Sequence, residues 1–254
     1  MDYIKDGLLY CGNCHTPKQW RGTLFGQERV MPCLCKCEKE RQEQEEQEQE
    51  KERQQKRIKA LRDDCFDSKE MHSWTFERDD RADKRLSEVC ENYVHIFPYM
   101  LNKGKGILFY GSVGTGKTFF SACIANALID QGISCMMTSV SRLATLMAGS
   151  KIDITESLNG YTLLILDDLA SERETEYMQE YVQMVIDARY RSHLPLIVTT
   201  NLTPEELKHP ADRRKARIYS RLFEMCIPVE VKGKDRRKEK LRADYAELRG
   251  VLNV

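Results

Sequence analysis

The stretch that most constrains this fold lies between residues 105 and 120. A short apolar run from Ile107 to Tyr110 leads into a glycine-rich turn over residues 111–116. Small and apolar residues then recur at helical spacing from Lys117 to Ile129. The stretch therefore predicts a strand, a loop and a helix, which is the structural setting that a phosphate-binding P-loop requires.

The loop carries the complete Gly-x-x-x-x-Gly-Lys-Thr pattern from Gly111 to Thr118. Backbone N–H groups of such a loop surround polyphosphate oxygens at a helix N-terminus, where the helix dipole also favours an anion. Lys117 is expected to reach the outer phosphates of ATP, and the Thr118 hydroxyl to bind Mg²⁺. The predicted nucleotide-binding residues are Gly111, Ser112, Val113, Gly114, Thr115, Gly116, Lys117, Thr118 and Phe119.

A second strand is predicted from Ile133 to Val140, followed by a helix from Ser141 to about Ser150. A third, apolar strand is predicted from Tyr161, and it ends in Asp167 and Asp168. This is the Walker B pattern, in which a buried parallel strand delivers the first acid to Mg²⁺. Asp168 could orient or deprotonate the attacking water. A long helix is predicted from about Thr175 to Arg191. The next apolar strand, Pro195 to Thr200, is followed by Asn201, which either contacts the γ-phosphate or its water, or simply begins a turn.

Length and charge narrow the class of protein. The 254 residues allow one α/β domain and a smaller appendage, and 40 basic against 40 acidic residues favour no particular partner. No run approaches the roughly 20 apolar residues of a membrane span, and the first residues lack the apolar core of a signal peptide. We expect a cytoplasmic protein without a membrane partner.

Five of the ten cysteines fall within the first 37 residues, and the other five lie singly in apolar or helical contexts, where we expect small buried side chains. In a reducing compartment this clustering predicts metal ligation, most simply structural zinc, rather than disulfides. The candidates are Cys11, Cys14, Cys33, Cys35 and Cys37, of which four would bind Zn²⁺. We favour Cys11 and Cys14 with Cys35 and Cys37. Cys33 remains a competitor for the second pair, and His15 is a weaker one.

Residues 38–57 consist only of Glu, Gln, Lys and Arg. These strong helix formers, without an apolar stripe, predict a solvated single helix, with a disordered linker as the alternative. The predicted domains are a zinc module over residues 1–37, a charged linker over 38–64 and an ATPase domain over 65–254. Within the last, Leu86 to Phe97 reads as a helix face, and Trp74 and Phe76 could cover an adenine or simply pack.

The C-terminal region is rich in arginine. We predict a helix beginning at Arg213, a short strand from Ile227 to Val231 and a final helix opening at Gly233 and including Lys240. Arginines here could form a solvated face or neutralise phosphate charge in catalysis. The five predicted strands, separated by helices, indicate an α/β fold with a doubly wound parallel sheet that binds nucleotide at its carboxyl edge.

The order of these motifs resembles the AAA+ class, and more closely the DnaC-like replicative helicase loaders and the IstB-like ATP-binding proteins. The resemblance rests on Lys105-Gly-Ile-Leu-Phe-Tyr-Gly-Ser-Val-Gly-Thr-Gly-Lys-Thr, Leu163-Leu-Ile-Leu-Asp-Asp-Leu, Thr199-Thr-Asn, Arg217-Ile-Tyr-Ser-Arg221-Leu and Gly233-Lys-Asp-Arg-Arg237. It implies that Arg221 is an arginine finger and Arg237 a sensor-2 arginine. Asp235 replaces the family's usual serine, so Arg236 stays an alternative to Arg237.

The resemblance further implies an ATPase that loads a DnaB-type hexameric helicase onto single-stranded DNA. ATP binding would form a homo-oligomer with sites shared between subunits. The N-terminal cysteine module resembles that of loaders from Gram-positive bacteria and their phages, in which it engages the helicase. The alternatives are an IstB-like transposition helper that binds duplex DNA, and a zinc adaptor without enzymatic activity.

Overall fold

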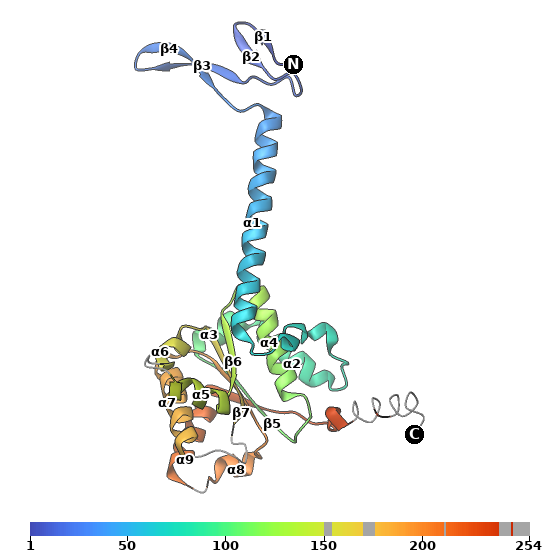
Figure 1. Ribbon diagram of the computed structural model, residues 1–254, viewed down its shortest axis with the longest axis vertical. Coiled ribbons are helices and arrows are strands. Elements are labelled where there is room, and N and C mark those ends of the chain that lie inside the picture. The colour runs from blue at the N-terminus through green and yellow to red at the C-terminus, as the bar shows by residue number, and fades with distance from the viewer. Residues whose placement is uncertain (150–153, 170–175, 211, 239–244, 246–254) are drawn as a thin grey trace. The chain divides into compact units, whose positions relative to one another are not determined.

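The computed structural model describes residues 1–149, 154–169, 176–210, 212–238 and 245 (Figure 1). The chain forms two compact units, Met1–Arg57 and Ile58–Val254. None of the helices in the described part of the chain combines the length and apolar character that crossing a membrane requires.

The first unit contains two small antiparallel hairpins followed by a helix. Its elements are β1 (Tyr3–Lys5), β2 (Leu8–Tyr10), β3 (Gln19–Leu24), β4 (Gln27–Pro32) and the first part of α1 (Lys36–Cys65). β1 pairs with β2, and β3 pairs with β4. Both connections hold two residues at positive φ, Asp6 and Gly7 in one and Phe25 and Gly26 in the other, as tight hairpin turns require. The sequence analysis had not predicted these strands.

Helix α1 confirms the helix predicted for residues 38–57 and extends beyond it at both ends. Its 30 residues span about 45 Å at ~1.5 Å per residue. The helix continues past Arg57 because Ile58, Leu61 and Cys65 pack on the hydrophobic core of the second unit. The charged composition of the linker therefore gives way to an apolar, packed end.

The second unit is built on a five-stranded sheet in which all neighbouring strands are parallel. The strands are β5 (Gly106–Tyr110), β6 (Cys135–Ser139), β7 (Leu163–Leu169), β8 (Leu196–Thr200) and β9 (Cys226–Glu230). Their order across the sheet is β6-β7-β8-β5-β9. The predicted parallel sheet is confirmed, and each predicted strand begins and ends within two residues of the observed one.

Alternate strand residues point to opposite faces of the sheet and enter separate hydrophobic cores. On β5, Ile107 and Phe109 join one core, and Leu108 joins the other. The first core is closed by the end of α1, α2 (Lys84–His95), α3 (Phe97–Lys103) and α4 (Lys117–Asp130). The second is closed by α5 (Val140–Gly149), α6 (Ile154–Asn159), α7 (Glu176–Ser192), α8 (Pro204–Lys208) and α9 (Arg213–Met225). Because helices cover both faces, the strands read as continuous apolar runs.

Two short 3-10 turns, η1 (Lys69–Ser73) and η2 (Phe76–Arg78), connect α1 to α2. The helix face predicted from Leu86 to Phe97 is confirmed for Leu86, Val89 and Tyr93 on α2. Its continuation to Phe97 on one helix is wrong, because α2 ends at His95 and α3 begins at Phe97. Pro98 lies in the first turn of α3, where a residue without a backbone N–H is tolerated. Leu86 and Phe97 are buried, as predicted, whereas Ile96 at the junction is 44% exposed.

The five cysteines outside the first unit were predicted to be small buried side chains. The structure confirms this for Cys65, Cys90, Cys123, Cys135 and Cys226. The final helix predicted from Gly233 is helical over residues 236–238, and its continuation lies outside the described residues. Outside them too lie Ser150 and Thr175, each a predicted helix boundary.

Candidate functional site

Three neighbouring strands end at one edge of the sheet and bring the predicted phosphate, metal and sensor residues together. β5 leads into the glycine-rich loop, β7 carries Asp167 and Asp168, and β8 ends directly before Asn201. β8 lies between the other two strands. Because the strands are parallel, their carboxyl ends share the edge at which open α/β sheets bind ligands. A cavity of about 510 Å³ lies here.

Lys117 is the first residue of α4, and its side chain lies over the glycine-rich loop. Its ammonium group donates hydrogen bonds to the carbonyl oxygens of Gly111 at 2.8 Å and Ser112 at 2.7 Å. Burial lowers the pKa of Lys117, while the carboxylates of Asp168 and Asp167 act in the opposite direction. The loop thus holds a largely buried cation against its own carbonyl groups.

The carboxylate of Asp167 is the centre of hydrogen bonding at this edge. It accepts hydrogen bonds from the Thr118 hydroxyl, at 3.0 and 3.2 Å, and from the Thr199 hydroxyl at 2.7 Å. Burial raises the pKa of Asp167, and both hydroxyl groups partly offset that rise. A carboxylate in contact with a threonine hydroxyl offers the hard oxygen ligands that Mg²⁺ prefers, so the pair fits this ion.

Thr199 is a site residue that the sequence analysis missed. Its hydroxyl donates to Asp167 and accepts a hydrogen bond from the backbone N–H of Asp168 at 2.8 Å. The side chain is buried on β8, so it fixes the end of β7 from the neighbouring strand. The available signal was a hydroxyl-bearing residue two positions before Asn201 at the end of an apolar strand.

Asp168 and Asn201 meet beside this network. The Asn201 side-chain amide donates a hydrogen bond to Asp168 Oδ1 at 3.2 Å. Asp168 has a φ of 62°, the left-handed conformation that aspartate adopts more readily than most residues. Its side chain is exposed. The structure therefore brings the second acid and the predicted sensor residue into direct contact at the cavity.

The segment after β9 packs against the glycine-rich loop. The backbone N–H of Arg236 donates to the Gly114 carbonyl at 3.0 Å, and both Arg236 and Arg237 line the cavity. The Arg236 guanidinium pairs with Asp80 at 3.2 Å. The Arg237 guanidinium makes no hydrogen bond or ion pair with any described residue. The two arginines proposed for one role thus have different surroundings.

Gly114→Ala is expected to destabilise the protein and weaken nucleotide binding. Gly114 has a φ of +78°, and a Cβ there would overlap the Asp235 carboxylate. The backbone conformation alone costs an alanine about 1–2 kcal/mol, and the overlap would displace the segment that carries Arg236. Thermal unfolding and ATP titration measure both effects. The control is Gly132→Ala, also at +78° but with no atom within 4 Å of its Cβ. Equal losses in both variants would contradict the role of the contact.

Arg221 is not among the residues that line this cavity. It forms an ion pair with Asp187 on α7 and lies over the ring of Tyr190, with 5.4 Å from the guanidinium carbon to the ring centroid. The Tyr190 hydroxyl donates in turn to Glu224 at 2.8 Å. The predicted arginine finger is therefore held on the α7–α9 surface, away from the glycine-rich loop.

Two aromatic side chains, Trp74 and Phe119, form an aromatic wall of the cavity. Their ring centroids lie 6.0 Å apart, with an interplanar angle of 47°. The exposed Glu70 lies on the same side. The Trp74 ring therefore packs against Phe119, one of the two uses considered from the sequence, and contact with an adenine stays a prediction. Phe76 packs on the core and is not among the residues that line the cavity.

Four cysteines of the first unit converge on one point. The Sγ atoms of Cys11, Cys14, Cys35 and Cys37 all lie within 4.8 Å of one another. Thiolates around one zinc ion with Zn–S bonds of ~2.3 Å would be roughly 3.8 Å apart, so this group could hold such an ion. The fifth candidate, Cys33, instead directs its sulfur to the Pro17 carbonyl at 3.5 Å. Neither Cys33 nor the imidazole of His15 belongs to the group.

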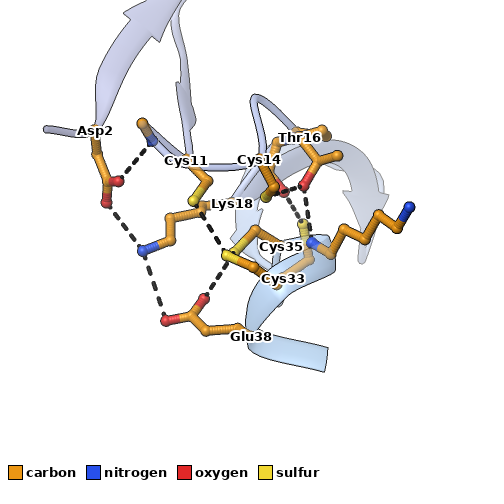
Figure 2. Close-up of polar contacts among 12 residues, drawn as sticks. Asp2, Cys11, Cys14, Thr16, Lys18, Cys33, Cys35 and Glu38 are labelled. Atoms are coloured by element: carbon orange, nitrogen blue, oxygen red, sulfur yellow. Dashed lines mark hydrogen bonds and ion pairs between the residues drawn. The ribbon is translucent and has the colours of Figure 1, made fainter. Parts of the chain in front are cut away.

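Polar side chains surround the cysteine group (Figure 2). The Thr16 hydroxyl lies 3.1 Å from the sulfur of Cys14, and this contact contributes most to lowering the pKa of that thiol to about 5. Burial raises the pKa of Cys35 to about 12, and its thiol donates to Glu38 at 3.3 Å. A cation at the centre of the group would favour loss of that proton.

Comparisons with known proteins agree with this geometry. A sequence profile of the IstB-like ATP binding protein family matches residues 38–243. The replicative helicase loader DnaI of Bacillus subtilis is 29% identical over 203 residues, which cover 72% of this chain and 64% of DnaI. The replicative helicase loader DnaC of Escherichia coli is 27% identical over 107 residues, which cover 39% of this chain and 44% of DnaC. The chain thus matches less than two thirds of either curated relative.

Among solved structures, a DnaC helicase loader is 26% identical with a TM-score of 0.55, and the match covers 65% of this chain and 100% of that chain. The predicted resemblance to DnaC-like loaders and the predicted AAA+ fold are confirmed. The profile match includes the glycine-rich loop, the acidic end of β7 and Asn201, so this chain belongs to the family of IstB-like ATP-binding proteins.

Proposed function

We propose that this protein is an ATP-dependent loader that places a replicative DNA helicase, a DnaB-type hexamer, on single-stranded DNA. The proposal rests on one observation above all, the meeting of Thr118, Asp167, Asp168 and Asn201 beside the glycine-rich loop. This arrangement suits binding and hydrolysis of a nucleoside triphosphate. The similarity to two replicative helicase loaders supports the choice of the helicase as partner.

Hydrolysis of ATP would divide the work among a few side chains. The loop N–H groups would bind the phosphates, and Lys117 would exchange the carbonyls of Gly111 and Ser112 for phosphate oxygens. Thr118 and Asp167 would hold Mg²⁺, whose charge would offset that of the phosphates. Asp168, oriented by Asn201, would position the attacking water or accept its proton.

Arg221 would act on ATP bound to a neighbouring subunit, because its side chain lies outside its own cavity. In the free subunit, Asp187 and Tyr190 hold its guanidinium. Assembly would replace these partners by phosphate. The planar guanidinium of arginine can bind two phosphate oxygens at once, which the ammonium of lysine does less well. Arg237, whose guanidinium is unpaired among the described residues, would act as the sensor-2 residue within the subunit.

The parts of the chain would then have separate tasks. Residues 1–37 would bind Zn²⁺ and engage the helicase, residues 38–64 would form the charged spacer, and residues 65–254 would form the ATPase domain. ATP would order a homo-oligomer around single-stranded DNA, and hydrolysis would release the helicase.

An IstB-like transposition helper is the second candidate, because the matching family carries that name. Such a protein would bind duplex DNA and a transposase in place of a helicase. A zinc adaptor without hydrolytic activity is the third candidate. It would bind its partner equally with and without ATP.

Co-purification with the replicative helicase of the source organism, with and without ATP, tests the proposal. We expect ATP-dependent capture and ATP-dependent assembly, both lost in Arg221→Ala while ATP affinity stays within about twofold. Hydrolysis should fall by ~10³-fold, as for other arginine fingers. Arg213→Ala, an exposed arginine on the same helix, is the matched control. Asp187→Asn, which removes the holding charge but keeps Arg221, should retain assembly.

Three results would contradict the proposal. Capture of a transposase rather than the helicase would favour the transposition helper. Absence of ATP hydrolysis in the presence of single-stranded DNA, with capture independent of ATP, would favour the adaptor. Loss of assembly in Asp187→Asn as complete as that in Arg221→Ala would assign Arg221 a structural role within its subunit.

A further inference from the structure

The side-chain amide of Asn126 on helix α4 is buried and fully hydrogen-bonded. The residue is 1% exposed. Its Oδ1 accepts a hydrogen bond from Arg62 Nε at 3.0 Å. Its Nδ2 donates to the carbonyl oxygens of Met71 at 2.8 Å and Trp74 at 2.9 Å. One amide on the helix that follows the glycine-rich loop therefore joins the end of α1 to the turn η1.

The two carbonyls bonded by Asn126 belong to Met71 in η1 and to Trp74 directly after it, in a segment that lines the cavity. Glu70 and Trp74 line the cavity, and the Trp74 ring packs against Phe119. If phosphates bind at the glycine-rich loop, as in the proposed function, the ribose and base of the nucleotide extend toward this aromatic wall. Base–aromatic contact of this kind contributes to affinity without requiring a particular base.

The other partner, Arg62, belongs to the apolar end of α1. Its guanidinium also pairs with Asp130, one helical turn after Asn126 on α4. Ile58 and Leu61 pack beside it on the first core. The last two turns of α1 are therefore attached to α4. The Asn126 amide that bonds Arg62 of these turns also bonds the backbone of Trp74 in the aromatic wall.

We propose that Asn126 is a positioning residue that fixes Trp74 against the nucleobase and couples base binding to the end of α1. A base that packs on Trp74 stabilises η1, and η1 shares its amide with Arg62. A buried amide that loses a partner is left unsatisfied. Opening of η1 therefore destabilises the packed end of α1, and opening of the α1 end destabilises the closed form of η1. Binding of the base, and not of the phosphates alone, thus stabilises the packing of residues 58–65.

The test compares MgATP with magnesium tripolyphosphate, which carries the phosphates without ribose or base. In a Trp20→Phe background, Trp74 is the sole tryptophan, so its fluorescence reports binding at the wall. The variant is Asn126→Asp, which keeps the size and the acceptor for Arg62 but replaces the N–H donors by a carboxylate oxygen. We expect about tenfold weaker ATP binding and tripolyphosphate binding within twofold of the parent.

Hydrogen exchange supplies the readout that a purely structural role would not change. ATP should slow backbone exchange over residues 58–65 in the parent, and tripolyphosphate should not. Asn126→Asp should lose this ATP-specific protection. Asp130→Asn is the control, because it removes the charge of the other partner of Arg62 and leaves all three bonds of Asn126 in place.

The outcomes separate this inference from the proposed function. A parent protein that binds neither ligand contradicts ATP binding itself. Equal weakening of both ligands in Asn126→Asp, or none, overturns the inference alone. If Asn126→Asp does not fold, Trp74→Leu replaces it, since Trp74 is only partly buried. Isothermal titration then replaces fluorescence, because this variant has no tryptophan. Trp74→Leu should also lose ATP affinity selectively, together with the protection of residues 58–65, and retention of both would overturn the inference.

Discussion

Lys117→Ala should weaken ATP binding on the order of 100-fold, because a charged hydrogen bond to phosphate contributes about 1.5–3 kcal/mol and Lys117 can reach more than one oxygen. The residue is only 7% exposed, and its ammonium group already lies over the loop, bonded to the carbonyls of Gly111 and Ser112. Isothermal titration with ATP and Mg²⁺ measures the loss, and helicase capture should disappear with it.

Alanine at this position also leaves the carbonyls of Gly111 and Ser112 without their donor, so the folded state must be checked by thermal unfolding. Lys232→Ala is a suitable control, because this lysine is exposed and pairs only with Glu230 among the described residues. It should bind ATP normally. Wild-type ATP affinity in a folded Lys117→Ala protein would show that the phosphates bind elsewhere.

Removing zinc should have the largest effect on the first unit. Residues 1–57 are all described, and the only buried apolar side chains among them are Cys11 and Cys35. The two hairpins therefore have almost no hydrophobic core, and units this small usually need a metal or disulfides to fold. A structural zinc ion supplies about 10–16 kcal/mol. We expect one zinc per chain by elemental analysis.

The cysteines themselves provide the matched comparison. Cys35→Ser should lose the zinc and the hydrogen-exchange protection of β1 to β4, because its sulfur lies inside the group. Cys33→Ser should keep both, because its sulfur contacts the Pro17 carbonyl instead. ATP binding by the second unit should survive in both variants. Zinc loss in Cys33→Ser with zinc retained in Cys35→Ser would reverse the assignment.

Much of the nucleotide site could be predicted because its parts are local. A glycine-rich loop of fixed spacing between an apolar strand and a helix has a predictable backbone conformation. Two acids at the end of a buried strand are likewise expected at the carboxyl edge of the sheet. The buried parallel sheet was equally visible, since strands covered on both faces are apolar throughout. Each of these features depends on a few consecutive residues.

What the sequence could not supply depends on contacts between distant segments. The place of β8 between β5 and β7 puts Thr199 onto Asp167, yet nothing near Thr199 distinguishes it from any hydroxyl at a strand end. Arg221 meets Asp187 only because α9 packs on α7. The turns of α1 after Arg57 are helical because Ile58, Leu61 and Cys65 pack on the first hydrophobic core.

The sequence by itself determined a phosphate-binding α/β domain with an acidic strand end, preceded by five cysteines and a charged helix. Only the tertiary structure excluded Cys33 from the thiol group, placed Arg221 outside its own cavity, and joined Arg62, Met71 and Trp74 through Asn126. The physical reason is the range of the interactions. Backbone conformation and apolar periodicity act over a few residues, whereas side-chain partners are chosen by how the whole chain packs.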